Sequence, residues 1–145
     1  MFYGEYIHTL DRKGRIVLPA HFREVARANF IEKFFITRGL DGCLFMFSEE
    51  EWKLQEQKFK SLSFTKQQAR IFNRIYFSGA QEIIPDKQGR ILLPSYLKDY
   101  AQIKKEVVFV GVANRIELWA KDKWLEFYKN NSQMFEEISE KIMEV

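Results

Sequence analysis

Cysteine and histidine are scarce in this chain, which has one cysteine and two histidines among 145 residues. Cys43 has no partner for an intrachain disulfide and lies in an apolar run, so we expect a small buried side chain and a reducing compartment. The sequence shows no spacing typical of a metal site, no Gly-x-Ser-x-Gly elbow and no phosphate-binding glycine loop. These absences predict a protein without catalytic activity, metal, cofactor or small-molecule substrate.

Long apolar runs are also missing. No segment approaches the roughly 20 apolar residues that a membrane span requires, and the N-terminus lacks the basic-then-apolar order of a signal peptide. With 46% hydrophobic and 30% charged residues, the composition is that of a globular chain. Its length suits one domain, or two small ones that share a core. We therefore expect a cytoplasmic protein without a membrane partner.

The net charge of +3 is too small by itself to indicate nucleic-acid binding. Its distribution is uneven, because residues 12–38 carry seven basic and two acidic side chains. From residue 117 to the end there are seven acidic and four basic side chains, which is typical of a solvated helical surface. The basic stretch is a candidate electropositive face for a polyanion.

An internal repeat organises the chain. Residues 11–19 (DRKGRIVLP) recur as residues 86–94 (DKQGRILLP), with six of nine positions identical. A second block aligns Gly39 with Gly111 and Trp52 with Trp124 in the same order. The duplication predicts two units, residues 1–75 with a core at about 5–47 and residues 76–145 with a core at about 77–120.

Both units have the same order of predicted elements: a strand, an Asp-x-x-Gly turn, a second strand, a helix with proline in its first turn, and two more strands. Helices follow, one with Ser48 as its N-cap and one opened by Thr65 and Gln68 as a capping box. In the second unit Trp124, Phe127 and Tyr128 should share one helix face. The predicted strands are 5–10, 15–18, 34–38, 43–47, 80–84, 90–93, 107–112 and 115–119, and the predicted helices are 20–28, 66–77, 95–100 and a final one with Phe135, Ile138, Ile142 and Val145 on one face.

A unit of roughly 45 residues is too small to bury a core alone. The two units should therefore interlock around a pseudo-twofold axis in an α+β fold. We expect one mainly β, barrel-like core with the helices packed outside. In that arrangement the two Asp-x-x-Gly-Arg turns lie near each other on one face.

The repeated turn places an aspartate four residues before an arginine. Asp11 can accept N–H bonds from its own turn and orient Arg15, and Asp86 can do the same for Arg90. We interpret the aspartates as structural residues that hold the turns, whereas both arginines are candidates for contacts to phosphate or to guanine. The residues expected to stabilise the turns are Asp11, Gly14, Asp86 and Gly89.

Further cations surround these turns. Arg12, Lys13 and Lys87 are candidates for DNA contacts, although solvated turn charge is an equally good interpretation. Arg23 and Arg27 lie four residues apart on a predicted helix, so they either extend the basic surface or belong to an ordinary solvated helix. Because most of these cations fall within residues 12–27, the first turn should dominate binding.

The duplicated Asp-x-x-Gly-Arg-Ile-x-Leu-Pro motif resembles that of the MraZ family, which are transcriptional regulators of the SpoVT/AbrB-like superfamily. The resemblance extends from Gly4-Glu5-Tyr6 through both motifs to the terminal helices. It implies a duplicated swapped-hairpin β-barrel and association of subunits into a ring-shaped homo-oligomer. It also implies binding of double-stranded promoter DNA at repeated boxes of the division and cell-wall gene cluster, in the cytoplasm at the nucleoid.

Two other classes stay open, an antitoxin or protein-interaction module and a purely structural ring protein. An antitoxin of this superfamily would have one hairpin followed by a flexible tail. The second motif and the patterned C-terminal helix favour the regulator over that class.

Overall fold

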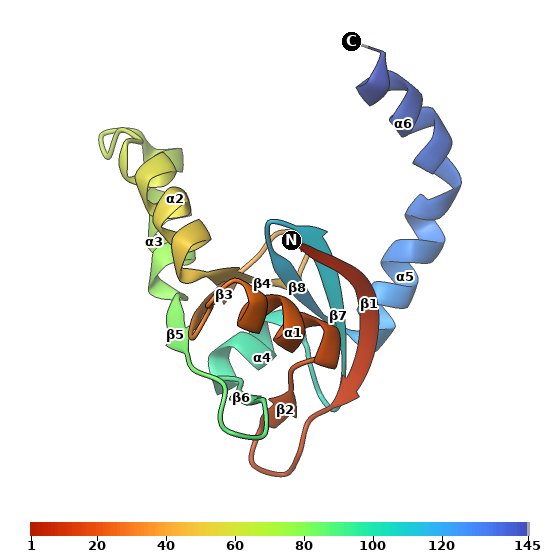
Figure 1. Ribbon diagram of the computed structural model, residues 1–145. Coiled ribbons are helices and arrows are strands. Elements are labelled where there is room, and N and C mark those ends of the chain that lie inside the picture. The colour runs from red at the N-terminus through yellow and green to blue at the C-terminus, as the bar shows by residue number, and fades with distance from the viewer. Residues whose placement is uncertain (145) are drawn as a thin grey trace.

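The computed structural model describes residues 1–144, so Val145, the last position of the predicted final helix, lies outside the described residues. Two copies of the repeat follow each other along the chain (Figure 1). The elements up to residue 78 are β1 (Phe2–Thr9), β2 (Arg15–Val17), α1 (Ala20–Ala28), β3 (Phe34–Arg38), β4 (Leu44–Ser48), α2 (Glu49–Lys60) and α3 (Gln67–Ser78). The later elements are β5 (Gln81–Ile83), β6 (Arg90–Leu92), α4 (Ser95–Ala101), β7 (Glu106–Ala113), β8 (Ile116–Ala120), α5 (Lys121–Asn131), the 3-10 helix η1 (Ser132–Met134) and α6 (Phe135–Met143).

The two copies interlock in one antiparallel sheet with the strand order β1-β7-β8-β4-β3-β5. Strand β1 pairs with β7, β4 with β8 and β3 with β5, so three of the five pairings join one copy to the other. When each strand is replaced by its equivalent in the other copy, the order reads the same from the opposite end. This palindrome confirms the predicted pseudo-twofold arrangement and the α+β class.

The strand pairings of residues 1–144 do not close the sheet into a barrel. Strands β1 and β5 are its two edges, and β2 and β6 form a separate two-stranded sheet. This second sheet, which we call the ribbon, lies below the larger sheet in Figure 1. The barrel-like core is therefore an open sheet covered by the ribbon and by α1 and α4.

Both faces of the larger sheet are buried, which explains why β4 is apolar at nearly every position. Leu44 and Met46 belong to a core shared with the ribbon, α1 and α4, whereas Phe45 and Phe47 belong to an aromatic core. Strand side chains alternate between faces, so a continuous apolar run is needed wherever both faces are covered. The aromatic core takes in Trp52 of α2 and reaches α5 through Trp124.

The helix boundaries required two corrections. Ser48 caps α2 as predicted, since its hydroxyl accepts the N–H of Glu51 at 3.2 Å. Thr65 does not cap α3, because that helix begins after Lys66 without a side-chain cap and the Thr65 hydroxyl bonds Ser63 instead. Arg70 donates to the carbonyls of Phe64 and Thr65.

The second correction concerns the two prolines. Pro19 and Pro94 are the N-cap residues of α1 and α4, one position before the first helical turn in which they were expected. Their extended ψ angles of 139° and 144° continue the preceding strands up to each helix.

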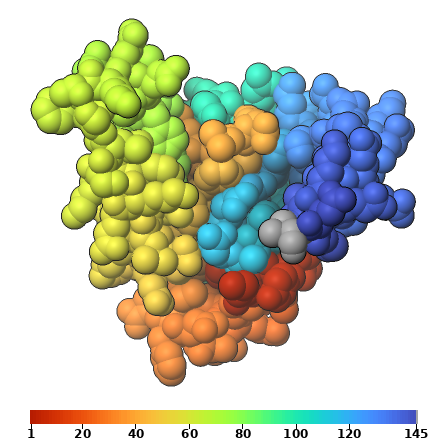
Figure 2. Space-filling view, turned by 90° about the horizontal axis from the view of Figure 1, so that it is seen from above, coloured from red at the N-terminus to blue at the C-terminus, as the bar shows by residue number. Residues whose placement is uncertain are grey.

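Two helical arms leave the core on opposite flanks, away from the ribbon (Figure 1). The hairpin arm consists of α2 and α3, and the C-terminal arm consists of α5, η1 and α6. Seen from above, the arms lie on separate sides of the molecule (Figure 2). On α5, Trp124 stacks on Phe127 and contacts Tyr128, as the sequence predicts. Among residues 1–144, no helix is long and apolar enough to cross a membrane.

The matched glycines of the repeat mark places where backbone approaches closely. A Cβ on Gly111 would lie 2.5 Å from the backbone nitrogen of Tyr3 in the paired strand β1. A Cβ on Gly39 would lie 2.8 Å from the carbonyl oxygen of Cys43. The two positions therefore exclude side chains because neighbouring backbone fills the space.

We expect Gly111→Ala to lower the free energy of unfolding by about 1–3 kcal/mol, because the β1 backbone must move to admit the methyl group. Chemical denaturation followed by circular dichroism measures this change. Gly79→Ala is the matched control, since its new Cβ would meet side-chain atoms of Arg38 and Thr37 rather than backbone. An equal loss in both variants would contradict the explanation.

Candidate nucleic-acid interface

The ribbon has one buried and one outward face. Ile16 pairs with Ile91, and both side chains are buried in the core. Because neighbours along a strand alternate and paired residues share a side, the residues flanking these two point outward. The outward face therefore consists of Arg15, Val17, Arg90 and Leu92.

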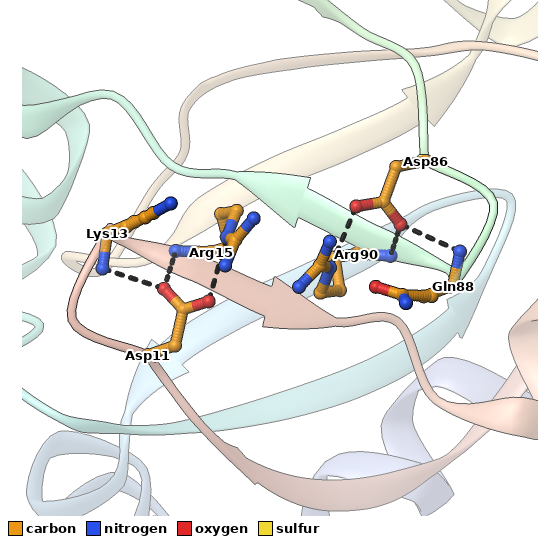
Figure 3. Close-up of polar contacts among 6 residues, drawn as sticks. All are labelled: Asp11, Lys13, Arg15, Asp86, Gln88 and Arg90. Carbon is orange, nitrogen blue, oxygen red and sulfur yellow. Dashed lines mark hydrogen bonds and ion pairs between the residues drawn. The ribbon is translucent and has the colours of Figure 1, made fainter.

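The turns that precede the two strands have the same hydrogen bonds (Figure 3). The Asp11 carboxylate accepts the N–H groups of Lys13 and Arg15 at 2.9 Å and the Arg15 Nε–H at 2.8 Å. Asp86 accepts the N–H groups of Gln88 and Arg90 and the Arg90 Nε–H at the same three distances. Each aspartate therefore stabilises its own turn and orients one arginine.

The glycines of the turns join one copy to the other. The Leu18 N–H donates to the Gly89 carbonyl at 2.8 Å, and the Leu93 N–H donates to the Gly14 carbonyl at 3.0 Å. Both glycines have positive φ angles, 78° and 77°, which side chains rarely adopt. The two turns lie at opposite ends of the ribbon. They are still close to each other, because each strand of the ribbon is only about 10 Å long.

The environment of the turns keeps both aspartates ionised. The backbone N–H of Arg15, followed by its guanidinium and the Lys13 N–H, holds the pKa of Asp11 below its usual value. The corresponding groups of Arg90 and Gln88 lower the pKa of Asp86. The two carboxylates therefore do not form a pair that shares a proton.

Each arginine offers its terminal nitrogens to the outside. Within residues 1–144, the hydrogen bonds of both guanidinium groups use Nε, which leaves Nη1 and Nη2 available. The side chains of Arg15 and Arg90 are 30% and 29% exposed. A planar guanidinium group that is held through Nε is well suited to bind a phosphate or a guanine edge with both of its terminal nitrogens.

In the folded chain, a basic side chain from each copy packs over the turn of the other copy. A Cβ on Gly89 would lie 2.6 Å from Cδ of Arg23, so this α1 side chain packs over the second turn. A Cβ on Gly14 would lie 3.1 Å from Nζ of Lys98, so this α4 side chain packs over the first turn. The cations near the first turn are Arg12, Lys13 and Lys98, and those near the second are Lys87, Arg23 and Arg27.

This packing changes how the basic side chains are divided between the two turns, compared with the division that the sequence suggested. Arg23, Arg27 and Lys87 line one groove of about 480 Å³ between α1 and the second turn. Arg23 and Arg27 therefore do not add to the first turn, as their positions within residues 12–27 suggested. The basic surface is shared almost evenly between the two ends of the ribbon.

Sequence reasoning missed three residues of this surface. Lys98 is the repeat equivalent of Arg23, so the alignment of the two copies already contained the signal. Val17 and Leu92 are likewise equivalent, and Leu92, which pairs with Arg15, is 58% exposed. The alternation of buried Ile16 and Ile91 with their neighbours would have placed both on the outward face.

Cys43 and His8, which could in principle be reactive, have structural roles. Burial raises the pKa of the Cys43 thiol, as expected for a buried cysteine. Partial burial and nearby Arg23 lower the pKa of His8, whose ring meets Phe109 edge-on at 5.8 Å. In the part of the chain that the structure describes, no group of three or more His, Cys, Asp or Glu side chains could hold a metal ion.

Acid should weaken the turns. A carboxyl group whose pKa is lowered by folding stabilises the native state above its unfolded pKa, and this contribution is lost as the pH falls through the folded value. We expect the free energy of unfolding to decrease once the pH drops under about 3.8, the ordinary pKa of aspartate. The decrease should be smaller in Asp11→Asn/Asp86→Asn. Denaturation curves at several pH values measure this, with Asp122→Asn as control. The same pH dependence in the double variant and the parent would contradict the assignment.

Known proteins match the chain along its whole length. A family model described as "MraZ protein, putative antitoxin-like" matches residues 1–75 and 76–144. A protein of Carboxydothermus hydrogenoformans named transcriptional regulator MraZ is 50% identical over 144 residues, which cover 99% of this chain and 98% of that protein. Proteins with the same name are 50% identical over 140 residues in Caldanaerobacter subterraneus subsp. tengcongensis, covering 97% of this chain and 95% of that protein, and 49% identical over 145 residues in Pelotomaculum thermopropionicum, covering 100% and 97%. Matches of this extent show that the chain belongs to the MraZ family.

Proposed function

We propose that this chain is a transcriptional regulator that binds double-stranded promoter DNA through its ribbon. The observation that carries the proposal is the outward face of the ribbon, where Arg15 and Arg90 are each held through Nε by an aspartate. The names of the relatives support a role in transcription. The regulator acts in the cytoplasm at the nucleoid.

The ribbon reads DNA from the major groove, which admits a two-stranded β-ribbon. The terminal nitrogens of Arg15 and Arg90 contact guanine O6 and N7, the pairing for which a fixed guanidinium is best suited. Leu92 and Val17, which pair across the ribbon with Arg15 and Arg90, contact thymine methyl groups. The flanking cations contact phosphates on either side: Arg12, Lys13 and Lys98 at one end, and Lys87, Arg23 and Arg27 at the other.

Self-association makes this small surface sufficient. One ribbon offers few base contacts, and a few phosphate contacts give weak, salt-sensitive binding. A ring-shaped homo-oligomer engages several promoter boxes at once and gains affinity without new contacts. The boxes lie at the division and cell-wall gene cluster, in line with the family resemblance. Each subunit consists of two SpoVT/AbrB-like repeats, residues 1–75 and 76–145.

Removing a base-reading arginine should weaken specific binding and relax sequence preference. We expect Arg15→Ala to lower affinity for a promoter duplex by about 1–3 kcal/mol, that is, about five- to 150-fold, and Arg15→Lys to recover little because the planar guanidinium is lost. Fluorescence anisotropy with specific and scrambled duplexes measures both effects. Lys129→Ala, which removes one exposed charge from α5, is the control. Unchanged affinity of Arg15→Ala would remove Arg15 from the interface.

Lys98 should act as a phosphate contact. We expect Lys98→Ala to weaken binding equally for all sequences and to reduce the slope of log affinity against log salt by about 1. A salt titration of the parent, Lys98→Ala and Lys129→Ala measures the slope. A parent without any salt dependence would favour the purely structural ring protein over the regulator.

A further inference from the structure

The loop that follows α1 holds an aromatic side chain in water on a left-handed backbone. Phe30 is 91% exposed, and its φ angle is 56°. The Phe30 N–H donates to the Arg27 carbonyl at 3.2 Å. The Ile31 N–H donates to the Ala26 carbonyl at 2.8 Å. These two hydrogen bonds close a helix around a residue that is usually glycine, because a Cβ disfavours the left-handed backbone.

The second copy ends its helix with the same two hydrogen bonds but without an aromatic side chain. Gln102, whose φ angle is 55°, takes the position of Phe30. Its N–H donates to the Asp99 carbonyl at 3.2 Å, and the next N–H donates to the Lys98 carbonyl at 2.9 Å. A polar residue serves this motif equally, so the fold does not require phenylalanine at position 30. A strained residue that the fold does not require suggests a functional role.

Phe30 borders a groove whose cations have no acidic partner. The groove of about 480 Å³ between α1 and the second turn, which we call the α1 groove, is lined by Phe30, Arg23, Arg27 and Lys87. Within residues 1–144, none of these three cations forms an ion pair. The buried Nε of Arg23 has no hydrogen-bond partner either. Their charge is therefore available to an anion from outside the chain.

The rest of the α1 groove does not cancel this charge. Asp86 lines it, but its carboxylate is bound to Arg90 and to its own turn. Glu32 then stands alone against three cations. The buried side chains of Leu18 and Phe34 also line the groove and make part of its wall apolar. A groove of this size, with apolar walls and a few charged groups, is typical of a site for a small ligand.

Phe30 also borders a second groove, of about 570 Å³, in which the charges are different. Its lysines are already paired, since Lys33 lies 3.1 Å and Lys53 lies 3.4 Å from the Glu49 carboxylate. The acidic side chains along it are Glu32, Glu49, Glu50 and Glu82. An anion is repelled there, so an anion bound beside Phe30 must lie in the α1 groove.

A mononucleotide has both chemistries that the α1 groove offers to bind. Guanidinium and ammonium groups are the usual partners of a phosphate, and an exposed aromatic ring is a platform on which any base stacks. A base inside a DNA duplex is already stacked, and extruding it costs free energy. A free nucleotide offers its base without that cost.

We propose that the α1 groove binds a free mononucleotide, with its phosphate at Arg23, Arg27 and Lys87 and its base against Phe30. The bound phosphate neutralises cations that the proposed function assigns to DNA phosphates at the second turn. The nucleotide therefore competes with promoter DNA and weakens its binding. The site stands without the proposed function, whereas the competition rests on it.

Isothermal titration calorimetry at low salt tests the site in the full-length chain. The probe is adenosine 5′-monophosphate (AMP), compared with inorganic phosphate and with adenosine. We expect AMP to bind about tenfold more tightly than inorganic phosphate, because stacking adds to the phosphate contacts. Phe30→Gln, which copies the residue of the second copy, should reduce AMP affinity to that of phosphate, and Phe30→Trp should retain it. Phe64→Gln makes the same change at another phenylalanine, 78% exposed on α2–α3, and should bind AMP like the parent.

Photolabelling covers the case in which Phe30→Gln does not fold. The parent is irradiated with 8-azidoadenosine 5′-monophosphate, digested, and mapped by mass spectrometry. We expect the label within residues 23–34 or 85–89, and its loss in the presence of excess AMP.

Three results would overturn the inference: AMP that binds no more tightly than phosphate, unchanged AMP affinity in folded Phe30→Gln, or a label confined to other residues. Anisotropy with promoter duplex separates the inference from the proposed function. AMP should weaken duplex binding by the parent and leave that of Phe30→Gln unchanged. AMP that binds without weakening the duplex would overturn the competition. Loss of duplex affinity in Phe30→Gln, in a parent that does not bind AMP, would assign Phe30 to DNA and overturn the site. A parent that binds AMP but no duplex leaves the site standing and removes the proposed function.

Discussion

The pairing of β2 with β6 is the interaction on which the rest of the structure depends. Neither copy of the repeat is large enough to bury a core, and each contributes one three-residue strand to the ribbon that covers the shared core. Ile16 and Ile91 meet on the buried side, and each turn glycine accepts a hydrogen bond from the opposite copy. The two turns are therefore fixed relative to each other by main-chain hydrogen bonds, and the outward face of the ribbon inherits that rigidity.

A rigid ribbon explains how a chain with a net charge of +3 can offer a specific surface to a polyanion. The aspartates do not read DNA in this scheme; they hold Arg15 and Arg90 through Nε and stay ionised while doing so. Side-chain entropy that a free arginine would lose on binding is already lost in the folded protein. Arg23 and Lys98 each pack over the turn of the other copy, which places cations at both ends of the ribbon. The basic surface therefore does not belong to one half of the chain.

The ribbon occupies one side of the core, and the amphipathic helices of the two arms leave from the other (Figure 1). The proposed function uses the ribbon side for DNA. It does not involve α6, on which Phe135 and Ile142 are exposed.

The sequence by itself determined the duplication, nearly all element boundaries to within a few residues, and the geometry of both turns. Those features follow from local chemistry: Asp11 bonds groups two and four residues away, and positive φ angles call for Gly14 and Gly89. The failed capping box at Thr65 shows the limit, because the Thr65 hydroxyl bonds Ser63 instead of a helix N–H. Only the tertiary structure decided that the sheet stays open, and that Arg23 belongs to the second turn and Lys98 to the first. The two cation positions depend on contacts between residues more than 60 positions apart, and no local pattern encodes which copy of a repeat packs against which.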